Sequence, residues 1–218
     1  LQPQPESQNE SLAELVADMK GGEVDMLVIL GGNPAYDAPA ELDFSNRIKK
    51  VSNAIHLAYR DNETSQLCHW HLNRAHGLEC WGDGRAWNGA YAVQQPLILP
   101  LFDGRSPLEL LAQVNASDTT AGFDLVRRTF NVVNGSGGLA EVFDPAWRGT
   151  LHRGVLKGSE AKLEAPKVRL AGLADDASTH AAGMQGKGGI ELAFAGAYSV
   201  YDGRWANNGW LQELPDPI

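Results

Sequence analysis

The chain has 218 residues, of which 43% are hydrophobic and 21% charged, and its formal net charge is −9. This length and composition fit one large globular domain, or one domain with an appendage, that buries a sizeable core. The acidic balance, without any cluster of lysine and arginine, excludes a nucleic-acid-binding surface, and no stretch of sequence approaches the roughly 20 apolar residues that cross a bilayer.

The two cysteines, Cys68 and Cys80, form neither a disulfide framework nor a CxxC pattern, so they do not indicate a compartment. The first residues lack the basic and apolar regions of a targeting segment. Because position 1 is Leu1, we expect a processed chain or a soluble piece excised from a longer protein.

Helix and strand signals alternate in the first third of the chain. Residues 1–10 are polar and rich in Gln and Pro, and we expect them to be disordered or to form a linker. A helix is predicted to begin at Ser11, which has capping-box spacing to Glu14, and to end at Gly21. Turn residues and apolar runs then predict a strand at 26–30, a helix within 40–50, a strand at 54–58 and a helix opening in 61–65.

Residues 26–30 are predicted to form a fully buried interior strand, because this continuous apolar run is bounded by Gly and Pro. The alternation of helix and strand is typical of a βαβ unit. Ligands bind such sheets beyond the carboxyl ends of the strands, which are here residues 31–34 and 60–64. We therefore expect these two loops to face a shared cleft.

The rest of the chain is predicted to be mainly helical and then irregular. Its elements are a broken or edge strand at 92–101, helices at 106–114, 123–133 and 144–155, an excursion at 158–189, a strand at 190–194 and an extended aromatic tail.

The predicted fold class is α/β, with a three-layer, mostly parallel sheet flanked by helices and an irregular C-terminal extension. Three parts follow from this: the segment 1–10, an α/β domain at 11–157, and a loop-rich excursion and strap at 158–218 that packs on the same domain.

The loop after the first strand is the most specific feature for ligand binding. Gly31 and Gly32 let a backbone approach a ligand closely, and Asn33 can hydrogen-bond through its side chain or main chain. The loop has neither the GxGxxG pattern nor the lysine of a phosphate cradle. A plain strand-to-helix turn explains the local sequence equally well.

Two other groups of polar residues have weaker interpretations. The side chains of Zn²⁺-ligand type are Cys68, His69, His71, His76 and Cys80, but their spacing matches no closed zinc site, and half-buried histidines explain them better. The carboxylates that could act as general acids or bases are Asp61, Glu63, Glu79 and Asp83. Nothing in the sequence pairs two of these carboxylates, so no catalytic residue is predicted.

Several segments together resemble the large subunits of molybdopterin oxidoreductases, over about residues 11–156 and 190–218. The matching segments are residues 24–34, 61–65, 68–72, 78–83, 95–98 and 202–215. The last segment is the most specific, and it is most similar to the branch found as the B subunit of alternative complex III, a quinol-oxidising respiratory complex. One departure is Asn73, where the family usually has proline.

The resemblance implies that two loops lie near a molybdopterin guanine dinucleotide in cofactor-containing members of the family. The corresponding residues here are Gly31, Gly32, Asn33, Pro34, Asp61, Glu63 and Thr64, as vestigial or candidate cofactor-binding residues. The protein ligand of molybdenum and the cysteines of the iron–sulfur clusters lie elsewhere in such subunits, so no cofactor, metal or catalytic residue is expected within this chain. The alternative complex III branch resembles a domain that lost molybdenum and kept the fold as a scaffold.

The resemblance therefore implies a scaffold and interaction domain of a membrane-associated, bacterial respiratory electron-transfer complex, on its periplasmic side. Its expected partners are the other domains of its subunit and the iron–sulfur and cytochrome subunits, with no nucleic acid and no direct membrane insertion. The alternative is the cofactor-binding part of an active molybdopterin-dependent oxidoreductase of the polysulfide or thiosulfate reductase type. A stand-alone zinc-binding module is a third, weaker hypothesis.

Overall fold

A computed structural model describes residues 7–135, 140–162 and 195–215, with only the backbone at 140–143. The chain divides into two units, Leu1–Lys162 and Leu163–Ile218, and each is described by itself. Across the described ranges, no helix combines the length and the apolar character needed to cross a membrane.

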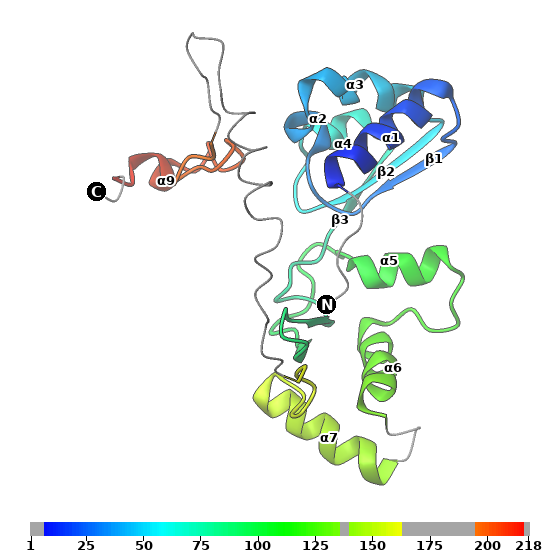
Figure 1. The fold of residues 1–218 in the computed structure, drawn as a ribbon, viewed down its shortest axis with the longest axis vertical. Helices are drawn as coiled ribbons and strands as arrows, with labels where there is room; N and C mark the ends of the chain where they lie inside the picture. Colours follow the sequence, from blue (N-terminus) through cyan, green and yellow to red (C-terminus); the bar gives the residue numbers. More distant parts are fainter. Residues whose placement is uncertain (1–6, 136–139, 163–194, 216–218) are drawn as a thin grey trace, which may run out of the picture. The chain divides into compact units, whose positions relative to one another are not determined.

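The first unit opens with short helices that alternate with parallel strands (Figure 1). In chain order these elements are α1 (Gln8–Gly21), β1 (Met26–Ile29), α2 (Pro34–Asp37), η1 (Ala40–Leu42), α3 (Phe44–Arg47), η2 (Ile48–Lys50), β2 (Asn53–Ala58), α4 (Glu63–Leu67) and β3 (Trp70–Asn73). A hairpin and three helices follow, namely β4 (Gly82–Arg85), β5 (Tyr91–Gln94), α5 (Pro107–Val114), α6 (Gly122–Asn134) and α7 (Ala140–Arg153).

The three strands β1, β2 and β3 form a parallel sheet in that order. β1 pairs with β2 from Met26 opposite Asn53, and β2 pairs with β3 from Ile55 opposite Trp70. The predicted α/β class, with a parallel sheet flanked by helices, is confirmed. Both strands predicted in the first third also form where the apolar runs placed them.

The prediction that the first strand lies in the interior of the sheet is wrong. β1 is at one edge of the three described strands, and Met26 at its start is 58% exposed. The central strand is β2, in which Ala54, His56 and Leu57 are fully buried. A continuous apolar run indicates apolar surroundings, but it does not report how many neighbouring strands a strand has.

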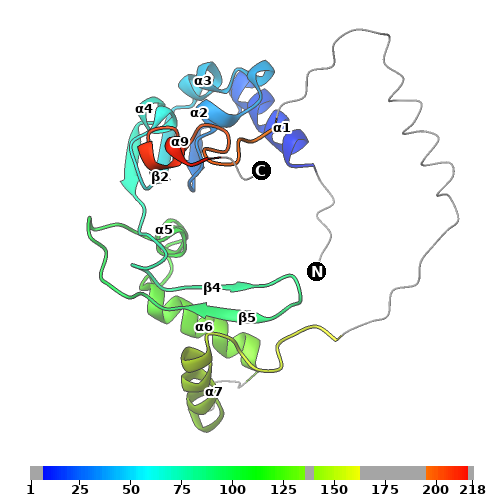
Figure 2. The ribbon, with the colours of Figure 1, turned by 90° about the vertical axis from the view of Figure 1, so that its left-hand side faces the viewer.

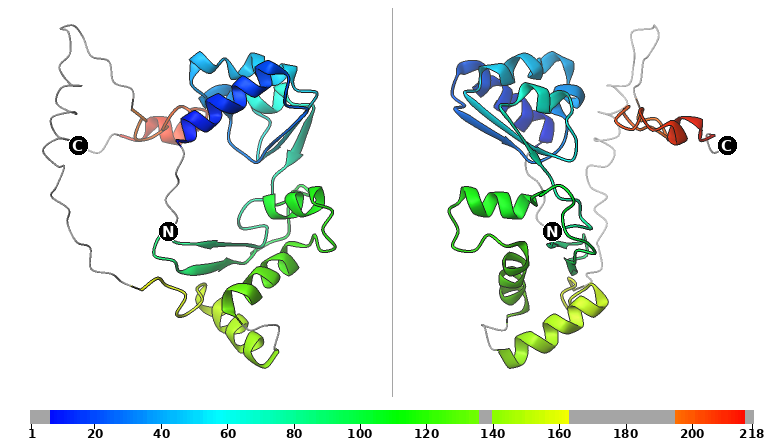
Figure 3. Two further views of the ribbon diagram at one scale, coloured as in Figure 1. Left: turned by 45° about the vertical axis from the view of Figure 1, so that its right-hand side comes forward. Right: turned by 180° about the vertical axis from the view of Figure 1, so that it is seen from behind.

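The helices α1, α3 and α4 pack on one face of this sheet. Leu27 of β1 and Ala54 of β2 belong to a cluster whose buried members from the helices are Val16, Met19, Phe44 and Ile48. His56 points to the same face as Ala54 because side chains alternate along a strand, and it contacts Ser65 of α4. Figure 3, in the colours of Figure 1, shows the helices of this part of the chain gathered beside the strands.

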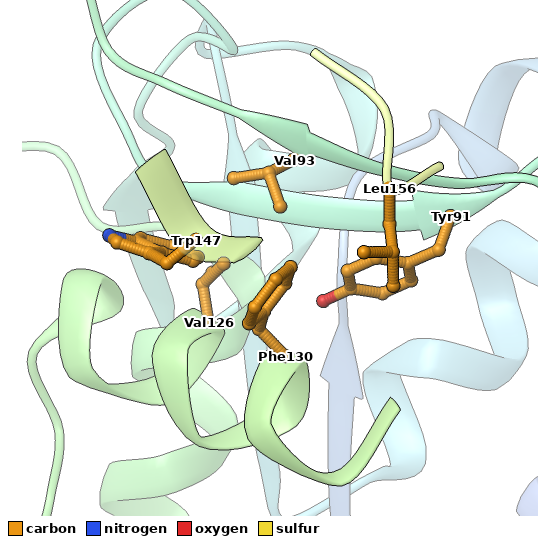
Figure 4. Close-up of a cluster of buried hydrophobic side chains, with 6 residues drawn as sticks. All are labelled: Tyr91, Val93, Val126, Phe130, Trp147 and Leu156. Atoms are coloured by element: carbon orange, nitrogen blue, oxygen red, sulfur yellow. The ribbon is translucent and has the colours of Figure 1, made fainter. Parts of the chain in front are cut away.

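A second core lies between the β4–β5 hairpin and the helices α6 and α7. β4 and β5 pair in antiparallel fashion and run beside α6 (Figure 2). The buried members of this cluster, drawn in Figure 4, are Tyr91, Val93, Val126, Phe130, Trp147 and Leu156. At its centre Phe130 meets Trp147 edge to face, with ring centroids 5.0 Å apart. Such contacts add specific geometry to the burial of apolar area.

Local sequence signals place several helix ends correctly. Ser106 and Glu109 form the reciprocal hydrogen bonds of a capping box at the start of α5. The C-cap residues of α1 and α6 are Gly22 and Gly135, which have φ angles of 79° and 66°. Glycine adopts this left-handed conformation without the strain of a Cβ atom.

Three predicted helix boundaries are wrong. α1 begins at Gln8, so the helix already includes part of the segment predicted to be disordered, and the Ser11 N–H donates to the Ser7 carbonyl inside it. The helix predicted within 40–50 is split at Asp43, whose φ of 52° is left-handed. α7 runs through Pro145 instead of beginning there. A tertiary setting overrides these local preferences, which are worth only about 1–3 kcal/mol each.

In the second unit the structure describes residues 195–215. An isolated bridge pairs Ala197 with Tyr201, and turns lead to α9 (Gly209–Glu213), whose N-cap residue is Asn208. The tail is therefore irregular as predicted, but it includes a short helix. The strand predicted at 190–194 and most of the excursion at 158–189 lie outside the described residues.

We expect Phe130→Ala to destabilise the first unit by about 3–5 kcal/mol, because it leaves a cavity among Tyr91, Val126 and Trp147. Urea denaturation followed by tryptophan fluorescence measures this change. The matched control is Val132→Ala on the same helix, where the side chain is 78% exposed. A loss of stability for Phe130→Ala no larger than that of the control would contradict the assignment of this core.

Candidate functional site

The loops that follow β1 and β2 meet at the carboxyl-end edge of the parallel sheet. Asn33 in the first loop contacts Glu63 and Thr64, which open α4 after the second loop. These three residues are called the Asn33 junction. The structure thus brings together residues 30 positions apart at the edge that the βαβ pattern indicated, and the shared cleft expected between the two loops stays a prediction.

Every polar atom of the Asn33 side chain is used within this junction. Its Oδ1 accepts hydrogen bonds from the Thr64 N–H at 3.1 Å and from the Thr64 hydroxyl at 2.8 Å. Its Nδ2 donates to a carboxylate oxygen of Glu63 at 2.7 Å. The Thr64 hydroxyl in turn accepts from the N–H of Ala35 at 3.0 Å. The two loops are therefore fastened to each other by side chains.

The charge state of Glu63 reflects the same contact. The hydrogen bond from Asn33 stabilises the carboxylate form and lowers the pKa of Glu63 below its ordinary value. Glu63 is exposed, so at neutral pH it contributes a solvated negative charge at the rim of the junction.

The glycines of the first loop lie beside an arginine that the sequence analysis did not single out. Gly31 and Gly32 have φ angles of 91° and 78°, which favour glycine. A Cβ atom at Gly31 would overlap the guanidinium of Arg74, which follows β3. Arg74 also lies over the Tyr59 ring, with 4.9 Å between Cζ and the ring centroid. Its Nε is buried and has no hydrogen-bond partner among the described residues.

A buried cluster of polar side chains lies beneath α4. The Ser65 hydroxyl oxygen is 2.8 Å from Nδ1 of His56 and 2.9 Å from Nδ1 of His71, and it donates to Oδ1 of Asn62. His56 is on the central strand and His71 is on β3, so one hydroxyl joins three elements. Sequence reasoning considered His71 as a possible zinc ligand but did not single out His56 or Ser65, because the spacing of residues 56, 65 and 71 has no short motif.

Pro34 and Asp61, like Gly31 and Gly32, take no part in the hydrogen bonds of the junction. Pro34 is the first residue of α2, where its missing N–H costs nothing. Asp61 is exposed, and its carboxylate forms no hydrogen bond or ion pair with any residue that the structure describes. The roles of Gly31, Gly32, Asn33, Pro34, Asp61, Glu63 and Thr64 toward a cofactor remain predictions.

The histidines and cysteines considered for zinc have other contacts. Nδ1 of His69 accepts the N–H of Ala54 at 3.1 Å, and Cys68 packs against the first core. Burial raises the pKa of both Cys68 and Cys80, so neither is an activated thiol. Within the described ranges, no three His, Cys, Asp or Glu side chains are grouped so that they could hold a metal ion.

The remaining acid–base candidates have local structural contacts. Asp83 accepts a 2.5 Å hydrogen bond from the hydroxyl of buried Tyr91, and burial together with this bond raises the pKa of Tyr91. Glu79 accepts the N–H of His76 in a turn. A hollow of about 250 Å³ lies between α5 and α6, and its lining includes Leu108, Asn115, Leu125 and Arg128 but none of the predicted site residues.

No family model matches this chain, and no curated protein matches it.

We expect Asn33→Ala to destabilise the first unit by about 1–3 kcal/mol, since it leaves the buried Thr64 N–H and hydroxyl without their acceptor. Hydrogen exchange should also become faster at Ala35 and Thr64. Chemical denaturation and amide exchange measure the two effects. Asn46→Ala is the control, because the Asn46 side chain makes one exposed hydrogen bond to nearby Asp43. Equal effects of the two substitutions would rule out the junction as a fastening of the loops.

Proposed function

We propose that this chain is an α/β scaffold and interaction domain of a molybdopterin-oxidoreductase-like subunit in a membrane-associated respiratory electron-transfer complex. The domain belongs on the periplasmic side and contacts other domains of its subunit and the iron–sulfur and cytochrome subunits. It carries no catalytic residue of its own. The basis for the family is the resemblance of residues 24–34, 61–65 and 202–215.

The observation that carries the scaffold role is the closed state of the Asn33 junction. A dinucleotide-binding loop presents free N–H and amide groups to its ligand. Here Asn33 has bonded all its polar side-chain atoms to Glu63 and Thr64, and Glu63 adds a negative charge at the rim. An anionic dinucleotide would have to break these bonds and approach that carboxylate. The junction favours a preserved fold over a binding site.

An exposed apolar segment supports the interaction role. Five large apolar side chains between β5 and α5 are each 49–86% exposed, namely Leu97, Ile98, Leu99, Leu101 and Phe102. The segment is held in place by hydrogen bonds from the N–H groups of Leu97 and Ile98 to the Leu78 carbonyl. Contiguous apolar surface of this kind marks sites of protein–protein contact.

One observation favours the alternative, a cofactor-binding part of an active molybdopterin-dependent oxidoreductase of the polysulfide or thiosulfate reductase type. The Arg74 guanidinium lies beside Gly31 at the carboxyl-end edge and forms no ion pair with any described residue. An anionic phosphate group would supply the missing negative charge. This alternative requires the Asn33 junction to open when the ligand binds.

Metal and pterin analysis of the full-length subunit in its native complex separates the two proposals. We expect molybdenum and tungsten far below stoichiometric amounts, and no fluorescent pterin derivative after oxidation, because the loops are closed on each other. Iron in the same sample serves as the positive control for retained cofactors. Molybdenum or tungsten near stoichiometry would overturn the scaffold role and favour the enzyme.

We expect Leu99→Asp in the full-length subunit to lower the yield of assembled complex at least several-fold, because a charge at an apolar contact must be desolvated. Leu99 is 86% exposed, so the fold of the domain itself should not change. Native gel electrophoresis and subunit quantification measure assembly. The control is Val132→Asp, at an exposed position on α6. Normal assembly of the Leu99→Asp subunit would show that this segment is not an interaction surface.

A further inference from the structure

The side chains of His56, Ser65 and His71 join α4 to β2 and β3. Among the described residues, these are the only hydrogen bonds between α4 and the two strands that involve an ionisable side chain. A hydroxyl has one hydrogen and two lone pairs. The Ser65 hydroxyl has three neighbours, because it donates to Asn62 and lies within 2.9 Å of both imidazole Nδ1 atoms. All three contacts are satisfied together when each imidazole donates its Nδ1–H to Ser65, and the neutral form of histidine that does so is the Nδ1–H tautomer.

This arrangement leaves Nε2 of His56 as an unprotonated nitrogen. His56 is 0% exposed, and its Nε2 has no hydrogen-bond partner among the described residues. Three groups act on the ring: Ser65 from α4, His71 from β3, and the Gly32 carbonyl from the loop after β1. The only titratable group of the three is His71, whose ring centroid is 6.2 Å away. A proton on His56 therefore meets the Gly32 carbonyl but no described carboxylate, and its charge lies beside a second imidazole.

We propose that His56, Ser65 and His71 form a proton-sensitive lock. With both imidazoles neutral, the lock holds α4 against β2 and β3. Protonation of His56 places an unpaired charge in the core, and the charge is solvated by release of α4 from the sheet. Because Thr64 lies next to Ser65 and binds Asn33, release of α4 also opens the Asn33 junction.

The direction of the pH dependence follows from the burial of His56. Burial lowers the pKa of His56, the Gly32 carbonyl raises it in part, and a positive charge on His71 acts in the same direction as burial. The open form, with a solvated imidazole, has an ordinary pKa of about 6.5 and binds the proton more readily than the closed form. The lock is therefore fully closed above about pH 6.5 and loses stability as the pH falls from there through the lowered pKa of the closed form.

The test is amide hydrogen exchange of the full chain between pH 7.5 and 5, corrected for the intrinsic pH dependence of exchange. We expect protection at Ala35 and at residues 64–67 to fall by up to about tenfold per pH unit below pH 6.5, which is the limit for uptake of one proton. Residues 125–130 in the second core should keep their protection and serve as the internal reference. Uniform loss of protection across both regions, or none at α4, would overturn the lock.

Two further measurements assign the effect to His56. The neutral variant His56→Gln should show no pH dependence at α4 in this range, whereas the control His152→Gln, at an exposed histidine of α7, should behave as the unaltered chain. Should His56→Gln fail to fold, ¹⁵N chemical shifts of the unaltered chain decide. We expect His56 to be a neutral Nδ1–H tautomer at pH 7.5 that takes up its proton only as α4 opens. A pKa at or above 6.5 for His56, or protonation of His56 without release of α4, would contradict the proposal.

Discussion

The hydrogen bonds between Asn33 and Thr64 are the contact on which the arrangement of the functional edge depends. They join the loop after the edge strand β1 to the start of α4, which follows the central strand β2. Because Thr64 is fully buried, its N–H and hydroxyl must find partners inside the protein. Asn33 supplies both acceptors through one oxygen. Because Oδ1 of Asn33 accepts both of these hydrogen bonds, it is not available to accept a hydrogen bond from a ligand.

This single constraint links the two proposals for function. If the junction stays closed, the carboxyl-end edge serves as structure, and the exposed apolar segment around Leu99 is the surface through which the domain acts. If the junction opens, Asn33 and Gly32 lie at the same edge as Arg74, which forms no ion pair with any residue that the structure describes. The His56 lock lies directly beneath α4, so the protonation of one buried imidazole biases the choice between these states.

The first unit contains two separate cores, and they differ in how much polar chemistry they include. The core of Tyr91, Phe130 and Trp147 is held by aromatic packing, with one buried hydroxyl paired to Asp83. The core beneath α1 and α3 adjoins the cluster of His56, Ser65 and His71 at the sheet. Apolar packing is insensitive to pH, whereas buried imidazoles are not. The parallel-sheet half is therefore the part of this unit that can respond to its environment.

The sequence by itself determined the elements whose causes are local. The apolar runs at 26–30 and 54–58 predicted both strands, and the helices predicted at 106–114 and 123–133 form as α5 and α6. It also indicated that the loops at 31–34 and 60–64 lie at the same edge of the sheet, since the carboxyl ends of neighbouring parallel strands are at one edge. Only the tertiary structure decided that β1 is an edge strand, that Arg74 covers Gly31, and that Ser65 joins His56 to His71. Those facts depend on contacts between residues distant in the chain, which neither periodicity nor spacing records.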